Sequence, residues 1–445
     1  MFYGKRSQLS PAAGQQCVRG RVTEASSDLF RIRNQDGLFE IAAARGQLPH
    51  RGDIVEVLVD RSHSPPRAVS LRRLVAPLRD PLEHSDSLFY RLHHGRGRVR
   101  NLLLCKSKAL ALVRRFFASR GFVEWQTPRL VASPGIEVHL KGFETHYLDR
   151  KGGRKRCYLP TSPEFSLKKA LCAGMDRIYE ICRCFRNGGE SGPLHQCEFT
   201  MIEWYRTYVD YEAIMRDVEE LAYFLEKSLR CSAADRFRGR RIDWTPPWPR
   251  TSLKELFLRH CSIDLGRALK DLPYFRRQSS RFLSQDATEQ AGFDDLFFQL
   301  FLSKIEPNLG LDKPEILYDY PAHMSALAAT KPGEPAFAER CEVYVSGVEL
   351  ANGFTELNDP FEQRARFEAA LREKRALGYP EVPVDQQFLQ ELEYGMPPAA
   401  GIALGLERLL MAIAGVEDIA MLFFLPHQWE QEDEQLLWPM QQEAE

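Results

Sequence analysis

The sequence predicts an α+β fold in two domains, a small β-barrel over residues 1–77 and a larger domain over residues 78–445. Short β-branched runs separated by turn residues are crowded into residues 17–76. Beyond a linker at Pro77–Pro81, helical apolar patterns are mixed with strands instead. A chain of 445 residues has room for two or three domains with a large core, so this division fits its length.

Composition and charge are those of an ordinary soluble globular protein, with 44% hydrophobic and 27% charged residues. The formal net charge of −1 excludes a global field that would draw the chain onto nucleic acid or a membrane. No apolar run reaches about 18 residues and no apolar signal core follows Met1, so we expect no membrane association and a cytoplasmic location. The 10 cysteines are scattered, which indicates reduced thiols.

The first domain is predicted from five short strands in about 60 residues: 18–22, 29–33, 38–41, 53–59 and 68–71. This density of strands is typical of a closed barrel of the oligonucleotide-binding type. Arginines along these strands could meet phosphates. They could equally form a solvated face, and the absence of an aromatic stacking stripe favours that interpretation.

The larger domain begins with a helix and a strand. Arg100–Arg120 has apolar residues at helical spacing, Gly121 ends it, and Phe122–Pro128 follows as a strand that closes at proline. This pair is typical of a dimer-forming element and also of an ordinary helix–strand unit. Ser162–Glu164 supplies a cap, a proline and an acidic first turn for the next helix, so its carboxylate could serve the helix alone.

The remaining elements alternate along the chain, with few chemical signals in the mixed region 231–335. Two strands joined by a glycine-rich loop are followed by an amphipathic core helix, a charged and mostly exposed helix, and a strand with a glycine turn into a helix: Ile178–Arg186, His195–Tyr205, Tyr211–Leu229, Leu357–Arg375 and Met396–Met411.

One face of the strand His195–Tyr205 is chemically unusual. A period of two places four of its side chains on this face: Phe199, Met201, Glu203 and Tyr205. On the partner strand, Cys184 and Arg186 share a face. A core does not need an arginine, an aromatic ring, a carboxylate and a phenol together, whereas an anionic, aromatic and aminated ligand does. The nearby Cys182, His195 and Cys197 match no standard zinc spacing, so we expect no zinc.

A second unusual stretch is Gly347–Asp359, where Glu349, Asn352 and Glu356 interrupt an apolar run. A buried unpaired charge is costly, so a cationic ligand or a metal would have to compensate these groups. The alternative is an edge strand whose polar side chains face water.

Taken in order, these blocks resemble the class II aminoacyl-tRNA synthetases, specifically the lysyl branch, over about residues 100–425. The helix, strand and Pro128 resemble motif 1. Three further blocks resemble motif 2, the lysine-recognition segment and motif 3: Phe185–Thr200, Gly347–Asp359 and Gly401–Arg408. The resemblance implies an antiparallel sheet flanked by helices, a homodimer, and ATP- and Mg²⁺-dependent activation of an amino acid to an adenylate.

The resemblance also implies roles in binding ATP. Arg186 would neutralise the α-phosphate and the substrate carboxylate, because a planar guanidinium suits both. Phe199 would stack on adenine, and Arg408 would stack on the other face or hold the γ-phosphate. Further ATP contacts would come from Asn187, Glu190 and His195. Mg²⁺ would be bound by Glu342 and Glu349, since hard cations prefer carboxylate oxygen.

For the amino acid, the resemblance implies that Glu164 takes the amino group near the carboxylate and Asn352 the carboxylate itself. The terminal ammonium would be held by Glu203, Tyr205 and Glu356. Phe354 and Ala403 complete the implied pocket. No side-chain nucleophile is needed, because the substrate carboxylate attacks phosphorus and the site supplies orientation and charge neutralisation.

Two branches of the family compete. One is lysyl-tRNA synthetase, which charges tRNA(Lys); the other is the shorter ligase that attaches (R)-β-lysine to a lysine of elongation factor P. Ala403, where the tRNA synthetases typically have glycine, favours the ligase. The N-terminal barrel, which the ligases usually lack, counts against it. We therefore expect lysine or β-lysine and elongation factor P as partners, with tRNA as the alternative acceptor.

The motif 2 loop departs from the family pattern. Gly188 and Gly189 follow Asn187, Glu190 is displaced, and Leu194 stands where an arginine is usual before the histidine. Because that loop normally holds adenine and the γ-phosphate, ATP binding could be weak. A catalytically silent amino-acid-binding protein is therefore a third interpretation.

Overall fold

The structure is a computed structural model that describes residues 9–44, 48–83, 87–138, 140–188, 192–229, 236–284 and 288–426, without the side chains of residues 94–96. The chain divides into two compact units, Met1–Asn101 and Leu102–Glu445, and each is described by itself. The domain boundary at residue 77 stays a prediction.

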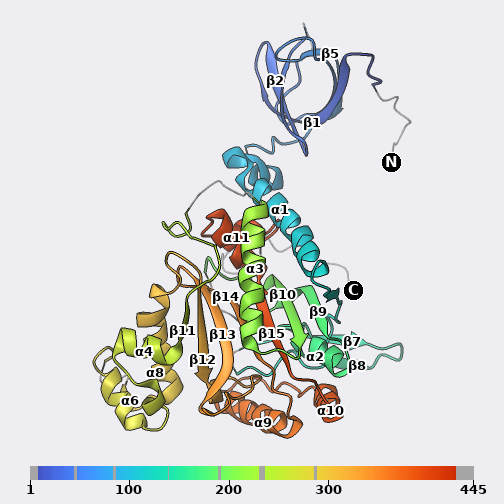
Figure 1. Ribbon diagram of the computed structural model, residues 1–445. Helices are drawn as coiled ribbons and strands as arrows, with labels where there is room; N and C mark the ends of the chain where they lie inside the picture. The colour runs from blue at the N-terminus through green and yellow to red at the C-terminus, as the bar shows by residue number, and fades with distance from the viewer. Residues whose placement is uncertain are drawn as a thin grey trace. The chain divides into compact units, whose positions relative to one another are not determined.

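The first unit contains a closed five-stranded barrel, drawn in blue in Figure 1, with strand order β1-β2-β3-β5-β4. Its strands are β1 (Gln15–Ala25), β2 (Leu29–Asn34), β3 (Gly37–Ala42), β4 (Ile54–Asp60) and β5 (Arg67–Val75). The barrel closes because β1 pairs with both β2 and β4. Its interior is filled by apolar side chains such as Val22, Phe30, Ile32, Val55 and Val57. The predicted barrel of the oligonucleotide-binding type is confirmed.

The second unit is built on an eight-stranded sheet with the order β11-β12-β13-β14-β15-β10-β9-β6. Neighbours are antiparallel except at the two edges, where β11 pairs with β12 and β6 with β9 in parallel. The strands are β6 (Val123–Glu124), β9 (Arg177–Phe185), β10 (Glu198–Thr207), β11 (Arg250–Ser252), β12 (Glu315–Pro321), β13 (Phe337–Val345), β14 (Val348–Thr355) and β15 (Ala399–Gly405). The antiparallel sheet implied by the resemblance is confirmed, although the strand expected over Phe122–Pro128 is shorter.

Two long helices and one short apolar helix cover one face of this sheet: α1 (Leu88–Ala118), α3 (Tyr211–Leu229) and α11 (Leu406–Ala414). In Figure 1, α3 crosses in front of the strands. Apolar side chains of the strands, among them Ile202, Trp204 and Ile402, pack into one core with them. Because alternate strand residues point to opposite faces, this core turns Glu203 and Tyr205 toward the other face.

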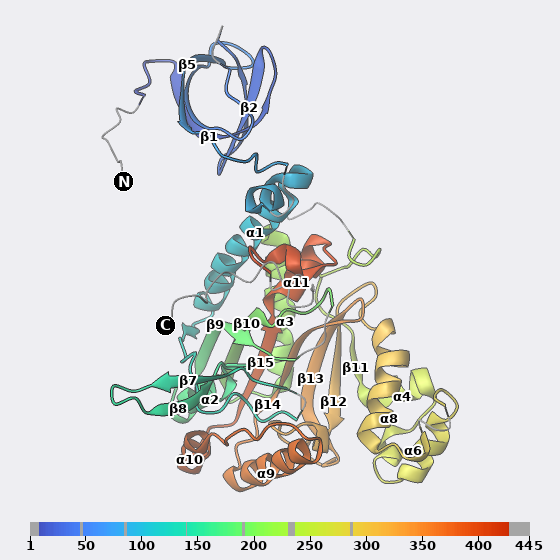
Figure 2. The ribbon, with the colours of Figure 1, turned by 180° about the vertical axis from the view of Figure 1, so that it is seen from behind.

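The opposite face, seen from the front in Figure 2, carries α2 (Glu164–Cys172). A smaller core joins α2 to α9 (Pro360–Ala376) and α10 (Gln386–Tyr394). The Ser162 hydroxyl accepts a hydrogen bond from the Glu164 backbone N–H, 2.9 Å away, but Pro163 and not Ser162 occupies the N-cap position of α2, so the predicted cap residue is wrong. The helix begins one residue later than predicted, with Pro163 before its first turn.

The remaining elements form a helical group beyond β12 and a hairpin beside α2. The helical group consists of α4 (Leu253–Cys261), α5 (Leu265–Ala268), α6 (Leu272–Ser279), α8 (Phe293–Leu300), the π-helical turn η1 (Phe301–Ile305) and the 3-10 turn η2 (Glu306–Asn308). The hairpin pairs β7 (Glu144–Leu148) with β8 (Arg154–Tyr158), and two further 3-10 turns are η3 (Ala322–Met324) and η4 (Ile419–Leu422). Within the described segments, no helix is long and apolar enough to cross a membrane.

Candidate active site

The strand register assembles a polar row across the sheet. Glu342 of β13 lies opposite Asn352 of β14, which lies opposite Ala403 of β15, which lies opposite Glu203 of β10. Directly opposite residues share a face, so these four side chains project from the face that carries α2. Residues taken from three predicted blocks therefore meet at one place, as the resemblance implied.

A bulge in β14 brings Glu349 to the same face. Val343 pairs with Ala351, but the next residue of β13, Tyr344, pairs with Glu349, so Leu350 is an extra residue. One extra residue reverses the alternation of side chains along the strand. Leu350 turns into the apolar core, and Glu349 joins the polar row instead of facing away from it.

Gly401 gives the Tyr205 ring its place beside the row. The two residues lie opposite each other in β15 and β10. A Cβ on Gly401 would come within 2.2 Å of the ring and within 2.8 Å of Glu356 Oε1. A side chain at this position would therefore push both groups out of the site.

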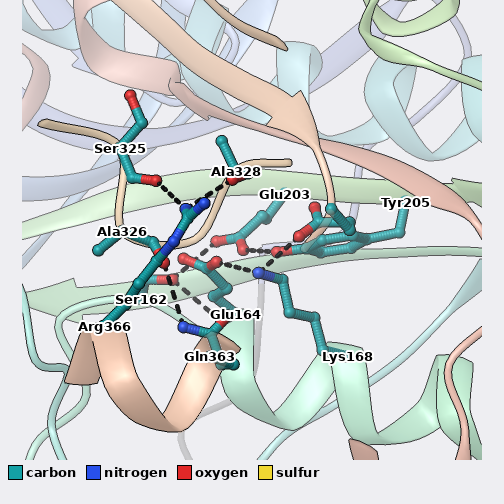
Figure 3. Close-up of polar contacts among 11 residues, drawn as sticks. Ser162, Glu164, Lys168, Glu203, Tyr205, Ser325, Ala326, Ala328, Gln363 and Arg366 are labelled. Carbon is teal, nitrogen blue, oxygen red and sulfur yellow. Dashed lines mark hydrogen bonds and ion pairs between the residues drawn. The ribbon is translucent and has the colours of Figure 1, made fainter. Parts of the chain in front are cut away.

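Three carboxylates lie around one internal cation, and two of them, Glu203 and Glu356, are fully buried. We call this group the acidic pocket: Glu164, Glu203, Glu356, Lys168 and Tyr205. Lys168 Nζ lies 2.5 Å from both Glu164 Oε1 and Glu356 Oε2. Glu203 accepts hydrogen bonds from the Tyr205 hydroxyl and from Ser162 Oγ, the latter at 3.0 Å. Figure 3 shows Glu164, Lys168, Glu203 and Tyr205 converging from α2 and the sheet.

The charges of the acidic pocket are unbalanced. Burial, together with the nearby Glu164 carboxylate, raises the pKa of Glu203 to about 8. Burial also raises the pKa of Glu356 to about 8, against the attraction of Lys168. The pKa of Glu164 is raised for the same reason. Burial disfavours the Lys168 ammonium, but Glu164 and Glu356 outweigh it and raise its pKa. Three acids with one ammonium favour the entry of a further cation.

Sequence reasoning missed Lys168. It follows Glu164 by four residues on α2, which is the spacing of a helical ion pair. That spacing was a readable signal, but a surface pair would have shown it equally. Lys168 also lies over the ring of Phe354, 5.0 Å from its centroid, so Phe354 lines the pocket as expected.

Sequence reasoning also missed Glu137, in the loop before β7. Its carboxylate raises the pKa of Glu164. Glu137 Oε2 is buried and accepts no hydrogen bond from the residues that the structure describes. A fourth acidic group therefore adds to the excess of negative charge beside Glu164.

An arginine-rich group lies at the other end of the row. The Arg186 guanidinium lies over the Phe199 ring, 5.1 Å from its centroid. Arg408 donates to the Glu349 backbone oxygen at 3.0 Å, and its Nη2 lies 2.8 Å from His195 Nε2. Burial and the charge of Glu342 raise the pKa of Glu349, while Arg408 and Arg186 oppose this. The structure thus brings together the residues expected to bind the phosphates.

Arg408 owes its position to the residue before it. Glu407 Oε2 accepts from the backbone N–H of Thr200 at 2.9 Å, and its Oε1 lies 2.6 Å from Lys106 Nζ. These contacts tie the first turn of α11 to β10.

Arg186 Nε is buried and has no hydrogen-bond partner among the described residues, so it can donate to an anionic ligand.

Among the described residues, one expected ATP contact is not found in this group. The Asn187 backbone pairs with Lys141, and no contact of its side chain places it with the arginines. Glu190 lies outside the described residues.

Glu342 is held by three donors. Its Oε2 accepts from the hydroxyls of Tyr320 and Tyr344, at 2.5 and 2.9 Å, and its Oε1 accepts from Arg340 at 2.5 Å. Arg340 Nε also donates to Asn352 Oδ1 at 3.2 Å, which leaves the amide NH₂ for an anionic ligand. No group of three or more His, Cys, Asp or Glu residues in the described segments could hold a metal by itself.

The fit of these residues to Mg²⁺ is still good. A carboxylate has about four acceptor positions, so Glu342 keeps one beyond its three donors. Mg²⁺ beside phosphates usually takes one or two carboxylates and completes its shell with phosphate oxygens and water. Glu349, whose side chain is 39% exposed, can supply the second carboxylate.

Helix α9 holds a loop that lies beside the pocket. Gln363 donates to the Ala326 oxygen at 3.1 Å, and Arg366 donates to the oxygens of Ser325 and Ala328 at 2.8 and 2.7 Å. Figure 3 shows both side chains reaching from the helix to this loop. Ala328 forms a bridge with Glu356. A helix predicted as mostly exposed therefore fixes the loop beside a carboxylate of the pocket.

Comparisons with known proteins identify relatives of this chain. A family model for class II tRNA synthetases (D, K and N) matches residues 88–429. The chain is 40% identical over 326 residues to the elongation factor P--(R)-beta-lysine ligase of Proteus mirabilis (strain HI4320), which is 73% of this chain and 94% of that protein.

Two proteins with the same name are similar to a comparable degree. The identity is 38% over 320 residues for Edwardsiella ictaluri (strain 93-146), covering 72% of this chain and 92% of that protein. It is 37% over 326 residues for Hamiltonella defensa subsp. Acyrthosiphon pisum (strain 5AT), covering 73% and 94%. The barrel lies outside the family match.

Proposed function

The chain belongs to the class II tRNA synthetase family of ATP-dependent ligases, and from this premise we propose that it activates lysine or (R)-β-lysine as an adenylate and transfers it to a lysine side chain of elongation factor P. The observation that carries the proposal is the acidic pocket, with its excess of buried carboxylate, beside the arginine-rich group. A diamino acid has two ammonium groups for the first and a carboxylate for the second.

Recognition of the amino acid follows from charge. Glu203 forms no ion pair with a described residue, and its two oxygens already accept from Tyr205 and Ser162. A substrate ammonium beside it would replace a proton by a permanent charge and complete the pocket. Glu164 and Glu356 share Lys168, which holds them in place for the same ligand. The Asn352 amide faces the substrate carboxylate.

Activation needs only orientation and charge neutralisation. A carboxylate oxygen of the amino acid attacks the α-phosphorus of ATP, the bond to the bridging oxygen breaks, and pyrophosphate leaves. Arg186 neutralises charge that develops on the α-phosphate, and Arg408 contacts the nucleotide. Glu342 and Glu349 would hold Mg²⁺, which supplies charge compensation for the phosphates. In the second step the acceptor amine attacks the carbonyl carbon of the adenylate, and AMP leaves.

A homodimer is part of the proposal. β6 is the last strand of the sheet and has only two residues. Large apolar side chains are exposed on and after it: Val123, Trp125 and Leu130. An exposed apolar edge favours coverage by another protein surface.

The tRNA-charging alternative is supported by the barrel, which the family match does not include. Transfer assays decide between the acceptors. The preformed adenylate is offered to elongation factor P and to tRNA(Lys), and we expect labelled amino acid on the protein alone. Label on tRNA alone would contradict the proposed acceptor and leave the activation step in place.

The ligand-free protein should lose stability as the pH rises from about 5 to about 8. The pKa values of Glu203 and Glu356 are raised to about 8, whereas glutamate in an unfolded chain titrates near about 4.3. Between these values the folded state holds more protons than the unfolded state, so the free energy of unfolding falls as pH rises. Thermal denaturation across this range measures the slope.

Saturating lysine should flatten this slope, because its ammonium keeps the carboxylates ionised. Glu203→Gln removes one of the two groups and should also flatten it, whereas Glu220→Gln, at an exposed surface pair, should not. Equal slopes in the wild type and in Glu203→Gln would contradict the titration of the pocket.

Ala403→Gly is expected to raise activity with α-lysine relative to β-lysine. Ala403 lies in the row between Asn352 and Glu203, so its methyl group stands where the substrate backbone would lie. One methyl group in a tight pocket is worth about 1–3 kcal/mol of discrimination. The measurement is the ratio of kcat/KM for the two substrates. An unchanged ratio would mean that Ala403 only packs against Cys182, Cys184 and Met201.

A further inference from the structure

A group of basic side chains in the first unit forms no ion pair among the residues that the structure describes. Arg21 of β1 and Arg33 of β2 lie directly opposite each other in the barrel. Like charges directly opposite in a sheet destabilise the pairing. Their neighbours on the barrel are different, because five of its arginines form ion pairs with carboxylates: Arg19, Arg31, Arg51, Arg72 and Arg73.

The beginning of α1 adds two more basic groups at the same place. The His93 ring lies tilted against the Phe89 ring, with centroids 4.3 Å apart, and Arg21 lies over that Phe89 ring at 5.0 Å. Arg100 donates to the backbone oxygen of Gln35, in the turn after Arg33. Burial lowers the pKa of His93 to about 4, and the positive charges of Arg33, Arg100 and Arg21 contribute to this shift.

Two polar atoms in this group are unused. Arg33 Nε and His93 Nδ1 are both buried and have no hydrogen-bond partner in the part of the chain that the structure describes. The carboxylate that acts on the group is Asp80, which influences Arg21 but is bonded to Arg51. Desolvated polar atoms without partners cost folding free energy, so a ligand with acceptors for Arg33 Nε would stabilise this arrangement.

We propose that Arg21, Arg33, His93 and Arg100 form a binding site for a phosphate group. Planar guanidinium groups match phosphate oxygens with paired hydrogen bonds, and several converging cations suit a multiply charged anion. The Phe89 ring already lies against Arg21 and the His93 ring, which leaves less of it to stack on a base. The site therefore fits the phosphate itself, either in the backbone of a nucleic acid or on a small molecule. This inference does not depend on the proposed function.

Binding is tested with the full-length protein at constant ionic strength. Inorganic phosphate, AMP and a short single-stranded RNA are titrated calorimetrically, with chloride as the reference anion. Arg33→Gln and Arg100→Gln should each weaken phosphate binding by at least about tenfold. Arg67→Gln is the matched control, because it removes an exposed charge from β5 of the same barrel and should change affinity less than about twofold.

The arms of the experiment distinguish the sources of the phosphate. RNA that competes with phosphate and loses affinity in Arg33→Gln identifies a nucleic-acid backbone. AMP that competes where RNA does not identifies a small phosphate ester. No binding above chloride, or equal losses in Arg33→Gln and Arg67→Gln, would overturn the proposal.

Two further readouts do not need tight binding. In phosphate-free buffer Arg33→Gln should be more stable than the wild type, because a like-charge pair is removed, and excess phosphate should reverse that order. The His93 ring, followed by NMR, should titrate near pH 4 in the free protein and at higher pH with phosphate, since an anion favours the imidazolium. The site would be contradicted if phosphate changed neither the relative stability of Arg33→Gln and the wild type nor the pH at which His93 titrates.

Discussion

Arg186→Ala should abolish adenylate formation while the protein stays folded. The guanidinium lies over Phe199, and its buried Nε has no hydrogen-bond partner among the described residues, so the fold does not depend on its charge. Removing one preorganised donor to developing charge costs about 10²–10³ in rate, and a charged donor should cost at least that. The measurement is ATP–pyrophosphate exchange, with thermal denaturation as the check on folding.

Arg183→Ala is the matched control. Arg183 lies on β9, three residues before Arg186, but its side chain is 46% exposed and is 3.6 Å from Glu198. We expect exchange in this variant to remain within about twofold of the wild type. If Arg186→Ala retained full exchange together with a normal thermal transition, Arg186 would not be at the α-phosphate.

Glu203→Gln should weaken amino-acid binding far more than ATP binding. Glu203 is the pocket carboxylate that no described cation neutralises, so a substrate ammonium would pair with it most directly. Truncating one partner of a buried, hydrogen-bonded charge pair costs about 2–5 kcal/mol. Calorimetric titration should therefore show a loss for lysine and an ATP affinity that is almost unchanged.

The stability of the same variant separates binding from folding. Without ligand, Glu203→Gln replaces a carboxyl group whose ionised form is disfavoured by burial, and should not lower the thermal transition. Glu356→Gln should show the same preference for amino acid over ATP with a smaller loss, because Glu203 remains. If Glu203→Gln lost affinity for lysine and for ATP equally, the substrate ammonium would not bind at this end of the site.

Much of the site could be predicted because strand periodicity is local. A period of two placed Phe199, Glu203 and Tyr205 on one face of β10, and the structure confirms it, with Trp204 in the core on the other side. The barrel and α3 were predicted for the same reason, since their apolar patterns reflect one buried face each.

The rest depends on how distant elements meet. In the sequence, Lys168 looks like an ordinary helical lysine. Its burial arises only because α2 packs against β14 and β10. Glu137 belongs to a loop without a periodic pattern. The bulge at Leu350 alone decides that Glu349 faces the row, because without it the alternation would send the side chain the other way. Sequence spacing contains none of these relationships.

The central claim is that the acidic pocket selects a diamino acid for adenylate formation. ATP–pyrophosphate exchange tests it most directly, with α-lysine, (R)-β-lysine, (S)-β-lysine and norleucine, which has the length of lysine without the terminal ammonium. The account predicts exchange with lysine or (R)-β-lysine and none with norleucine. Exchange that is equal with norleucine, or absent with every lysine isomer, would contradict it.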